Sequence, residues 1–140
     1  MGDTPSGGTM GTIYCKAHID VPAAKAWDFL DRYTRSENHI FSNCVSERQD
    51  GEYRVVTTVD GMEIWELNVS VDAENMRASY TIPGLLGAEH HHASMQVLDD
   101  GTDGCMLVWI TDFRPHDWAE EIRPFYDVMF AEMIAAIVAS

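Results

Sequence analysis

Positive charge is scarce in this sequence. Its 140 residues contain 9 Lys and Arg against 23 Asp and Glu, so the formal net charge is −14 at pH 7. Nucleic acids and anionic membrane surfaces are bound by clustered cations, which this composition does not supply. We therefore expect no nucleic-acid partner, and we interpret the acidity mainly as a source of solubility.

Cysteine is also sparse, and long apolar runs are missing. Cys15, Cys44 and Cys105 are odd in number and far apart, so neither a disulfide framework nor a zinc knuckle is predicted. No apolar run approaches the roughly 18–20 residues that span a bilayer, and the first residues do not resemble a signal peptide. We expect a cytoplasmic protein without membrane insertion, in which residues 1–11 form a flexible leader and residues 12–140 form one domain.

Motifs for cofactor and nucleotide chemistry are missing as well. The sequence contains no P-loop, no GxGxxG and no Ser/His/Asp order, so we expect no cofactor and no triad hydrolysis. The run Glu89-His90-His91-His92 suggests a metal site at first sight. Because adjacent strand residues point to opposite faces, at most two of these histidines share a side. We interpret the run as a polar strand start and predict no metal.

What the sequence does contain is a regular alternation of strands and turns. Asp50-Gly51 and Asp60-Gly61, each between alternating segments, are hairpin-turn signals. Seven strands are predicted at residues 12–20, 43–49, 52–59, 62–72, 76–82, 89–98 and 105–113. Two short helices are expected after the first strand, at residues 23–33 and 34–40.

A long C-terminal helix is predicted from an N-cap at Asp117 to about Val138. Pro124 either kinks this helix or marks a continuous part that starts near Ile122. One face carries an apolar stripe of Trp118, Ile122, Phe125, Tyr126, Met129, Phe130, Met133, Ile134 and Ile137. Such a wide stripe needs cover, so we predict an α+β helix-grip fold: a curved antiparallel sheet around the helix, with a small-molecule cavity between them.

Three segments of the sequence resemble a known family: IDVPAAKAWDFL, GMEIWELNVSVDAENMRASYTI, and HHHASMQVLDDGTDGCMLVWITDFRP before the terminal helix. With the order of elements, they resemble the START-like (SRPBCC) superfamily, in particular its polyketide cyclase/dehydrase and lipid-transport family. The abscisic-acid receptors of the same fold are similar more weakly. The resemblance implies a cavity for hydrophobic or aromatic ligands. It implies no single reaction, since members transport lipids, sense hormones, or act as aromatases and cyclases.

The wall of the cavity depends on which face of each strand points inward. In the strand at residues 62–72, simple alternation places Trp65 inside and Glu66 outside. The resemblance implies the opposite for Glu66, because an acid at the corresponding place faces the ligand in hormone-receptor relatives. A one-residue bulge would reconcile the two. Alternation also places His91 inside and His92 outside.

Glu66, His91 and His92 are the candidate catalytic residues. A neutral imidazole titrates near physiological pH, and burial would raise the pKa of a carboxyl, so the two could exchange protons with a ligand. The alternatives are a solvated Glu66 and a histidine that only hydrogen-bonds a ligand or a water. The candidate ligand-binding residues are His39, Phe41, Trp65, Tyr80, Leu85, Trp109, Asp112, Tyr126, Met129 and Phe130.

These ligand-binding candidates have simpler interpretations too. Tyr80 and Tyr126 are also explained as core aromatics, and Asp112 as a rim carboxylate. The loop at residues 83–87, which contains Leu85, resembles a gate but is equally an ordinary loop tip or a dimer contact.

Three functions therefore stay open. The first is a lyase of the aromatase/cyclase or dehydratase type, which requires Glu66 and a histidine to converge in the cavity. The second is a non-catalytic carrier or sensor of a lipid or aromatic metabolite. The third is a homodimer formed through the outer sheet face, which would place Trp65 and Trp109 together on the convex side.

Overall fold

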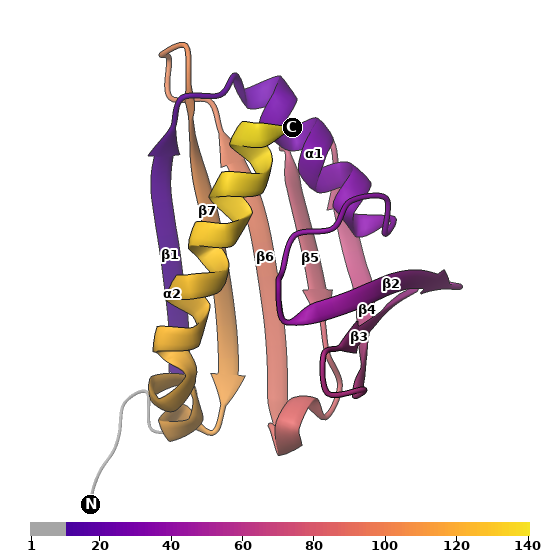
Figure 1. The fold of residues 1–140 in the computed structure, drawn as a ribbon. Coiled ribbons are helices and arrows are strands. Elements are labelled where there is room, and N and C mark those ends of the chain that lie inside the picture. Colours follow the sequence, from indigo (N-terminus) through magenta and orange to yellow (C-terminus); the bar gives the residue numbers. More distant parts are fainter. Residues whose placement is uncertain (1–10) are drawn as a thin grey trace, which may run out of the picture.

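The computed structural model describes residues 11–140, apart from the side chain of Leu86, and contains a seven-stranded antiparallel sheet (Figure 1). The strand order across the sheet is β1-β7-β6-β5-β4-β3-β2. In chain order the elements are β1 (Gly11–Ile19), α1 (Ala23–Thr34), β2 (Cys44–Asp50), β3 (Tyr53–Thr58), β4 (Glu63–Asp72), β5 (Arg77–Thr81), the 3-10 turn η1 (Leu85–Gly87), β6 (His90–Leu98), β7 (Cys105–Arg114) and α2 (His116–Ala139).

The predicted helix-grip fold is confirmed, and no strand end differs from the prediction by more than one residue. The two Asp-Gly turns join β2 to β3 and β3 to β4, and Gly51 and Gly61 adopt φ angles of 62° and 88°. Glycine adopts this left-handed conformation without steric cost, which is why Asp-Gly is a reliable hairpin signal.

A single short helix, α1, lies between β1 and β2, so the predicted second helix at residues 34–40 is wrong. Ser36 has a φ of 61°, and two hydrogen bonds close the end of α1: Glu37 N–H to Arg32 O and Ser36 N–H to Tyr33 O, both 3.0 Å. This pattern is the Schellman motif, which turns the chain out of the helix. Glycine normally occupies the left-handed position, and Ser36 therefore gave no stop signal.

The predicted leader ended at residue 11, but Gly11 is the first residue of β1. A Cβ atom at Gly11 would lie 2.7 Å from Ala119 Cβ and 2.9 Å from His116 O, so only glycine allows β1 to pass so close to α2. The rest of the predicted leader, residues 1–10, lies outside the described residues.

The long helix α2 is continuous from His116, two residues before Trp118, and includes Pro124. Its N-cap is Pro115 rather than the predicted Asp117, which lies in the first turn, and the alternative start near Ile122 is wrong. No helix in the described part of the chain is long and apolar enough to cross a membrane.

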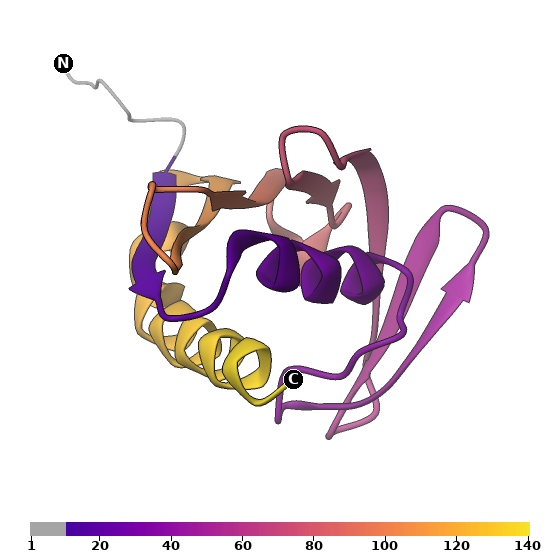
Figure 2. The same cartoon turned by 90° about the horizontal axis from the view of Figure 1, so that it is seen from above.

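The sheet curves around both helices (Figure 2). The helix α2 packs on β1 and β7, while α1 packs on β4, β5 and β6. The buried side of α1 carries Ala26, Trp27, Leu30 and Tyr33, which recur at the spacing of one helix face. Together the two helices cover different parts of the concave face, and the site lies between them.

Candidate functional site

A cavity of about 340 Å³ lies between the concave face of the sheet and α2. Its volume falls within the range of about 300–1,000 Å³ that is usual for small-molecule sites. Most of its wall is apolar. The lining residues are Tyr33, Phe41, Asn43, Cys44, Arg54, Val56, Thr58, Val59, Asp60, Met62, Ile64, Glu66, Tyr80, Ile82, Leu85, Met95, Trp109, Trp118, Ile122, Phe125, Tyr126, Met129 and Met133.

Glu66 lines this cavity, whereas Trp65 lies on the outer face with 37% of its surface exposed. The predicted inward position of Trp65 is therefore wrong. Its ring packs edge-on against Tyr53 at 5.5 Å and lies under the guanidinium of Arg48 at 5.5 Å. These outer contacts explain an apolar side chain on the convex side, which simple alternation assigned to the core.

A bulge in β4 separates two alternation patterns. Asn68 pairs with Tyr80, but the next pair is Ser70 with Ser79, so Val69 is the extra residue. Paired residues share a face of the sheet. Before the bulge Glu66 and Asn68 therefore lie on the inner face, and after the bulge Val71, which pairs with Ala78, lies on that same face. The bulge thus lies three residues after Glu66, in the strand for which a bulge was offered as the way to reconcile an inward Glu66 with simple alternation.

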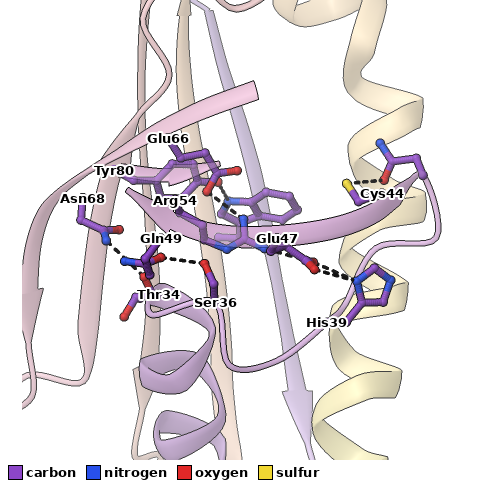
Figure 3. A network of polar contacts seen from close by, with 12 residues as sticks. Thr34, Ser36, His39, Cys44, Glu47, Gln49, Arg54, Glu66, Asn68 and Tyr80 are labelled. Atoms are coloured by element: carbon purple, nitrogen blue, oxygen red, sulfur yellow. Dashed lines mark hydrogen bonds and ion pairs between the residues drawn. The ribbon is translucent and has the colours of Figure 1, made fainter. Parts of the chain in front are cut away.

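A buried ion cluster holds Glu66 in place (Figure 3). Arg54, only 1% exposed, donates from Nη1 to Glu66 Oε1 at 3.1 Å and from Nη2 to Glu47 Oε1 at 3.3 Å. The guanidinium carbon lies 3.8 Å from the centre of the Tyr33 ring. Burial raises the pKa of Glu66, and the charge and hydrogen bond of Arg54 act in the opposite direction.

Neither Arg54 nor Glu47 was among the sequence candidates. The signal was nevertheless present, because Arg54 interrupts an apolar strand and faces Glu66 across the β3–β4 pair. A charged residue in such a strand is almost always paired when it is buried.

Two phenols and an indole add further polar groups to the cavity wall: Tyr80 and Trp109 from the sheet and Tyr126 from α2. Trp109 Nε1 donates to the Tyr80 hydroxyl at 3.0 Å, which leaves the Tyr80 proton available to a ligand. Burial raises the pKa of both Tyr80 and Tyr126, and the charge of Glu66 raises them further. Both phenols therefore stay protonated at neutral pH and are able to donate a hydrogen bond to a ligand.

The histidines do not join Glu66. His91 is 4% exposed and lies between Tyr80 and Phe113 with ring centroids 5.8 and 5.2 Å away, but it is not part of the cavity wall. Its Nδ1 accepts the Ile82 N–H at 3.0 Å. His92 lies opposite Asp112 in the β6–β7 register, and its side chain is on the outer face of the sheet. The predicted convergence of a histidine with Glu66 in the cavity is therefore not found.

The other predicted ligand-binding residues divide into two groups. The cavity wall includes Phe41, Tyr80, Leu85, Trp109, Tyr126 and Met129. His39, Asp112 and Phe130 do not line the cavity. His39 is exposed and pairs with Glu47 at 2.8 Å, Asp112 accepts a hydrogen bond from Thr12 at 2.6 Å, and Phe130 is buried in the core.

Two other sequence hypotheses can be compared with the geometry. Trp109 is buried on the inner face while Trp65 is on the outer face, so the joint convex patch expected of a homodimer is not formed. Within residues 11–140 no group of three or more His, Cys, Asp or Glu side chains is arranged to hold a metal ion.

Acid is expected to destabilise the fold through His91. Burial lowers the pKa of His91 from 6.5 to about 4, and the flanking His90 and His92 act in the same direction. The unfolded chain takes up the proton first as the pH falls, so stability is unaffected above pH 6.5 and decreases between pH 6.5 and 4. The expected loss is about 3 kcal/mol, from roughly 2.5 pH units at 1.36 kcal/mol each.

The measurement is the free energy of unfolding in urea across this pH interval for the wild type and for His91→Gln. The glutamine amide can still accept the Ile82 N–H but does not titrate. Between pH 6.5 and 4 the free energy of unfolding of His91→Gln should fall by about 3 kcal/mol less than that of the wild type. Identical pH profiles would contradict the assignment to His91.

A curved antiparallel sheet closed over a long helix, with an apolar cavity between them, defines a helix-grip ligand-binding domain. The chain belongs to the polyketide cyclase/dehydrase and lipid transport family, whose model matches residues 10–140. None of the curated proteins matches it in sequence.

Solved structures with the same fold share little sequence with this chain. The protein XoxI from Bacillus cereus is 14% identical with a TM-score of 0.76, over 91% of this chain and 92% of that one. A Thermobifida fusca protein is 22% identical, TM-score 0.74, over 90% and 89% of the two chains. Norcoclaurine synthase from Thalictrum flavum, in complex with dopamine and hydroxybenzaldehyde, is 17% identical, TM-score 0.66, over 94% and 88%. At these identities the likeness shows the fold alone.

Proposed function

We propose that the protein binds one small, mainly apolar molecule with an aromatic ring in the cavity, as a carrier or sensor. The observation that carries the proposal is the composition of the wall: a mainly apolar enclosure with aromatic side chains from α1, β5, β7 and α2, and with Glu66 among its few polar side chains. Phe41 stacks on Trp109 at 6.0 Å, and Trp109 packs on Tyr126 at 4.9 Å. A flat ring ligand matches such a surface, because aromatic pairs favour offset and edge contacts.

Binding is favoured over His/carboxylate catalysis because the catalytic pair is not assembled. His91 Nδ1 is used by the Ile82 N–H, and His92 lies on the other side of the sheet from Glu66. A cytoplasmic location remains part of the proposal, and Cys15, Cys44 and Cys105 are all free thiols, as a reducing compartment would keep them.

Proton transfer by Glu66 alone is the second candidate function. A buried carboxyl with a raised pKa next to two phenol donors is the arrangement that a general base needs. Norcoclaurine synthase, which has the same fold, is solved in complex with dopamine and hydroxybenzaldehyde, and this supports the candidate. Deuterium incorporation beside the carbonyl of 2-tetralone, lost in Glu66→Gln, would support this candidate over simple binding.

Filling the cavity is expected to weaken ligand binding. Met129 is 9% exposed and lines the cavity, so an indole at this position occupies ligand space. We expect Met129→Trp to weaken the binding of 2-naphthylmethanol by at least about tenfold, or about 1.4 kcal/mol, in calorimetry.

The matched control is Val128→Trp. Val128 is the preceding residue on the same helix and is 61% exposed, so the same indole there points away from the cavity. Its affinity should equal that of the wild type. Equal losses in both variants, or no binding by the wild type, would contradict the proposed function.

A further inference from the structure

Acidic side chains outnumber basic ones in the cavity wall. Of the described residues that line it, Asp60 and Glu66 are acids and Arg54 is the one cation. The charge of Arg54 is already shared, because Nη2 bonds Glu47 behind the wall while Nη1 bonds Glu66. With both glutamates ionised, the cluster of Arg54, Glu47 and Glu66 has a net charge of −1 by this count.

Glu66 can accept a further hydrogen bond from a ligand in the cavity. Among the described residues its hydrogen bond runs through Oε1 to Arg54, and no partner bonds Oε2. An ionised carboxylate accepts hydrogen bonds only, so a group that meets Oε2 has to be a donor. Charge-assisted bonds of this kind are stronger than neutral ones, and the gain is largest where water is excluded.

Arg54 does not offer a comparable place for an anion. Both terminal nitrogens bond carboxylates, and the ring of Tyr33 lies 3.8 Å from the guanidinium carbon. A ligand carboxylate that approached Arg54 would also lie beside Glu66, and two like charges at close range repel. The formal net charge of −14 on the whole chain adds a field that attracts cations and repels anions.

We infer that the ligand presents a hydrogen-bond donor, an amine or a hydroxyl on an aromatic ring system, to Glu66 Oε2, and that the cavity discriminates against carboxylates. The inference rests on the proposed function and adds the chemical class of the ligand. Protonated alkyl amines attached to an aromatic ring are the best match, neutral alcohols of the same kind come next, and aromatic or fatty acids are the poorest.

A matched series of naphthalenes tests this order. The compounds are 2-naphthylmethylamine, 2-naphthylmethanol and 2-naphthoic acid, titrated into the full chain by calorimetry at about pH 7.5, where the amine is a cation and the acid an anion. We expect the amine to bind at least about tenfold more tightly than the acid, with the alcohol between them.

Two variants separate the effect of the Glu66 carboxylate on ligand preference from the effect of the overall charge of the protein. Glu66→Gln removes the charge at the cavity end, and we expect it to reduce the amine-to-acid affinity ratio at least about tenfold. Glu63→Gln removes the same charge three residues earlier on β4, where Glu63 is exposed and bonds Trp65 Nε1 on the outer side. It should leave the ratio unchanged.

The outcomes separate the inference from the function on which it rests. If all three compounds bind but the acid equals or exceeds the amine, the ligand class is wrong and the proposed function stands. If the ratio falls equally in both variants, the preference arises from overall charge and the role of Glu66 is wrong. If no compound binds, the proposed function itself fails.

Discussion

Arg54→Met is expected to destabilise the protein by about 3–5 kcal/mol, because it leaves two carboxylates without their cation in a largely buried place. Arg54 is 1% exposed, and the side chains of Glu47 and Glu66 are 9% and 16% exposed. Methionine preserves most of the apolar volume of the side chain, so the loss reports the charge and the hydrogen bonds. The measurement is urea unfolding with linear extrapolation to water.

The control is Arg48→Met on the neighbouring strand β2. Arg48 is about half exposed and pairs with Asp50 at 3.4 Å and Glu63 at 3.5 Å. Exposed pairs contribute about 0–1 kcal/mol, so this variant should remain near the wild type. Adding Glu66→Gln to Arg54→Met should restore part of the lost stability. Equal losses for Arg54→Met and Arg48→Met would show that the buried cluster is not what holds β2, β3 and β4 together.

Phe113→Ala is the second substitution with a large expected effect, a loss of about 3–5 kcal/mol. Phe113 is fully buried, and its ring lies 4.5 Å from Trp118 and 5.7 Å from Tyr126, both on α2. Removal of the ring loses this burial and leaves a void between β7 and the helix. Thermal and urea unfolding of the variant measure the loss.

A second phenylalanine provides the comparison. Phe125 on α2 is 48% exposed, and we expect Phe125→Ala to cost about 1 kcal/mol or less because little surface returns to water. If the two variants lost the same stability, Phe113 would not be the contact that fixes α2 on the sheet.

The overall fold could be predicted from the sequence because its signals are local. Asp-Gly turns need a left-handed glycine, and Gly51 and Gly61 provide it. The spacing of apolar residues on α2 follows from the helix period, and Tyr126, Met129, Met133 and Ile137 are buried as that period requires. These features depend on neighbours within a few residues, which a single sequence displays.

The site was harder to predict because it depends on the exact register of neighbouring strands. The position of Val69 as a bulge is visible only in the β4–β5 register. The outward Trp65 is stabilised by Tyr53 from another strand, so its apolar character did not reveal its face. Arg54 meets Glu47 and Glu66 from two neighbouring strands; its place among apolar strand residues signals a buried charge, but only the strand register identifies its partners.

Methionine methyl NMR offers the most direct test of the central claim that this cavity holds a small aromatic molecule. Met62, Met95, Met129 and Met133 line the cavity, whereas Met76 and Met106 do not and serve as internal references. On titration with 2-naphthylmethylamine, we expect saturable ring-current shifts at the four lining methyl groups and little change at the two references. Unchanged spectra, or shifts at Met76 and Met106 equal to those of the lining residues, would contradict the account.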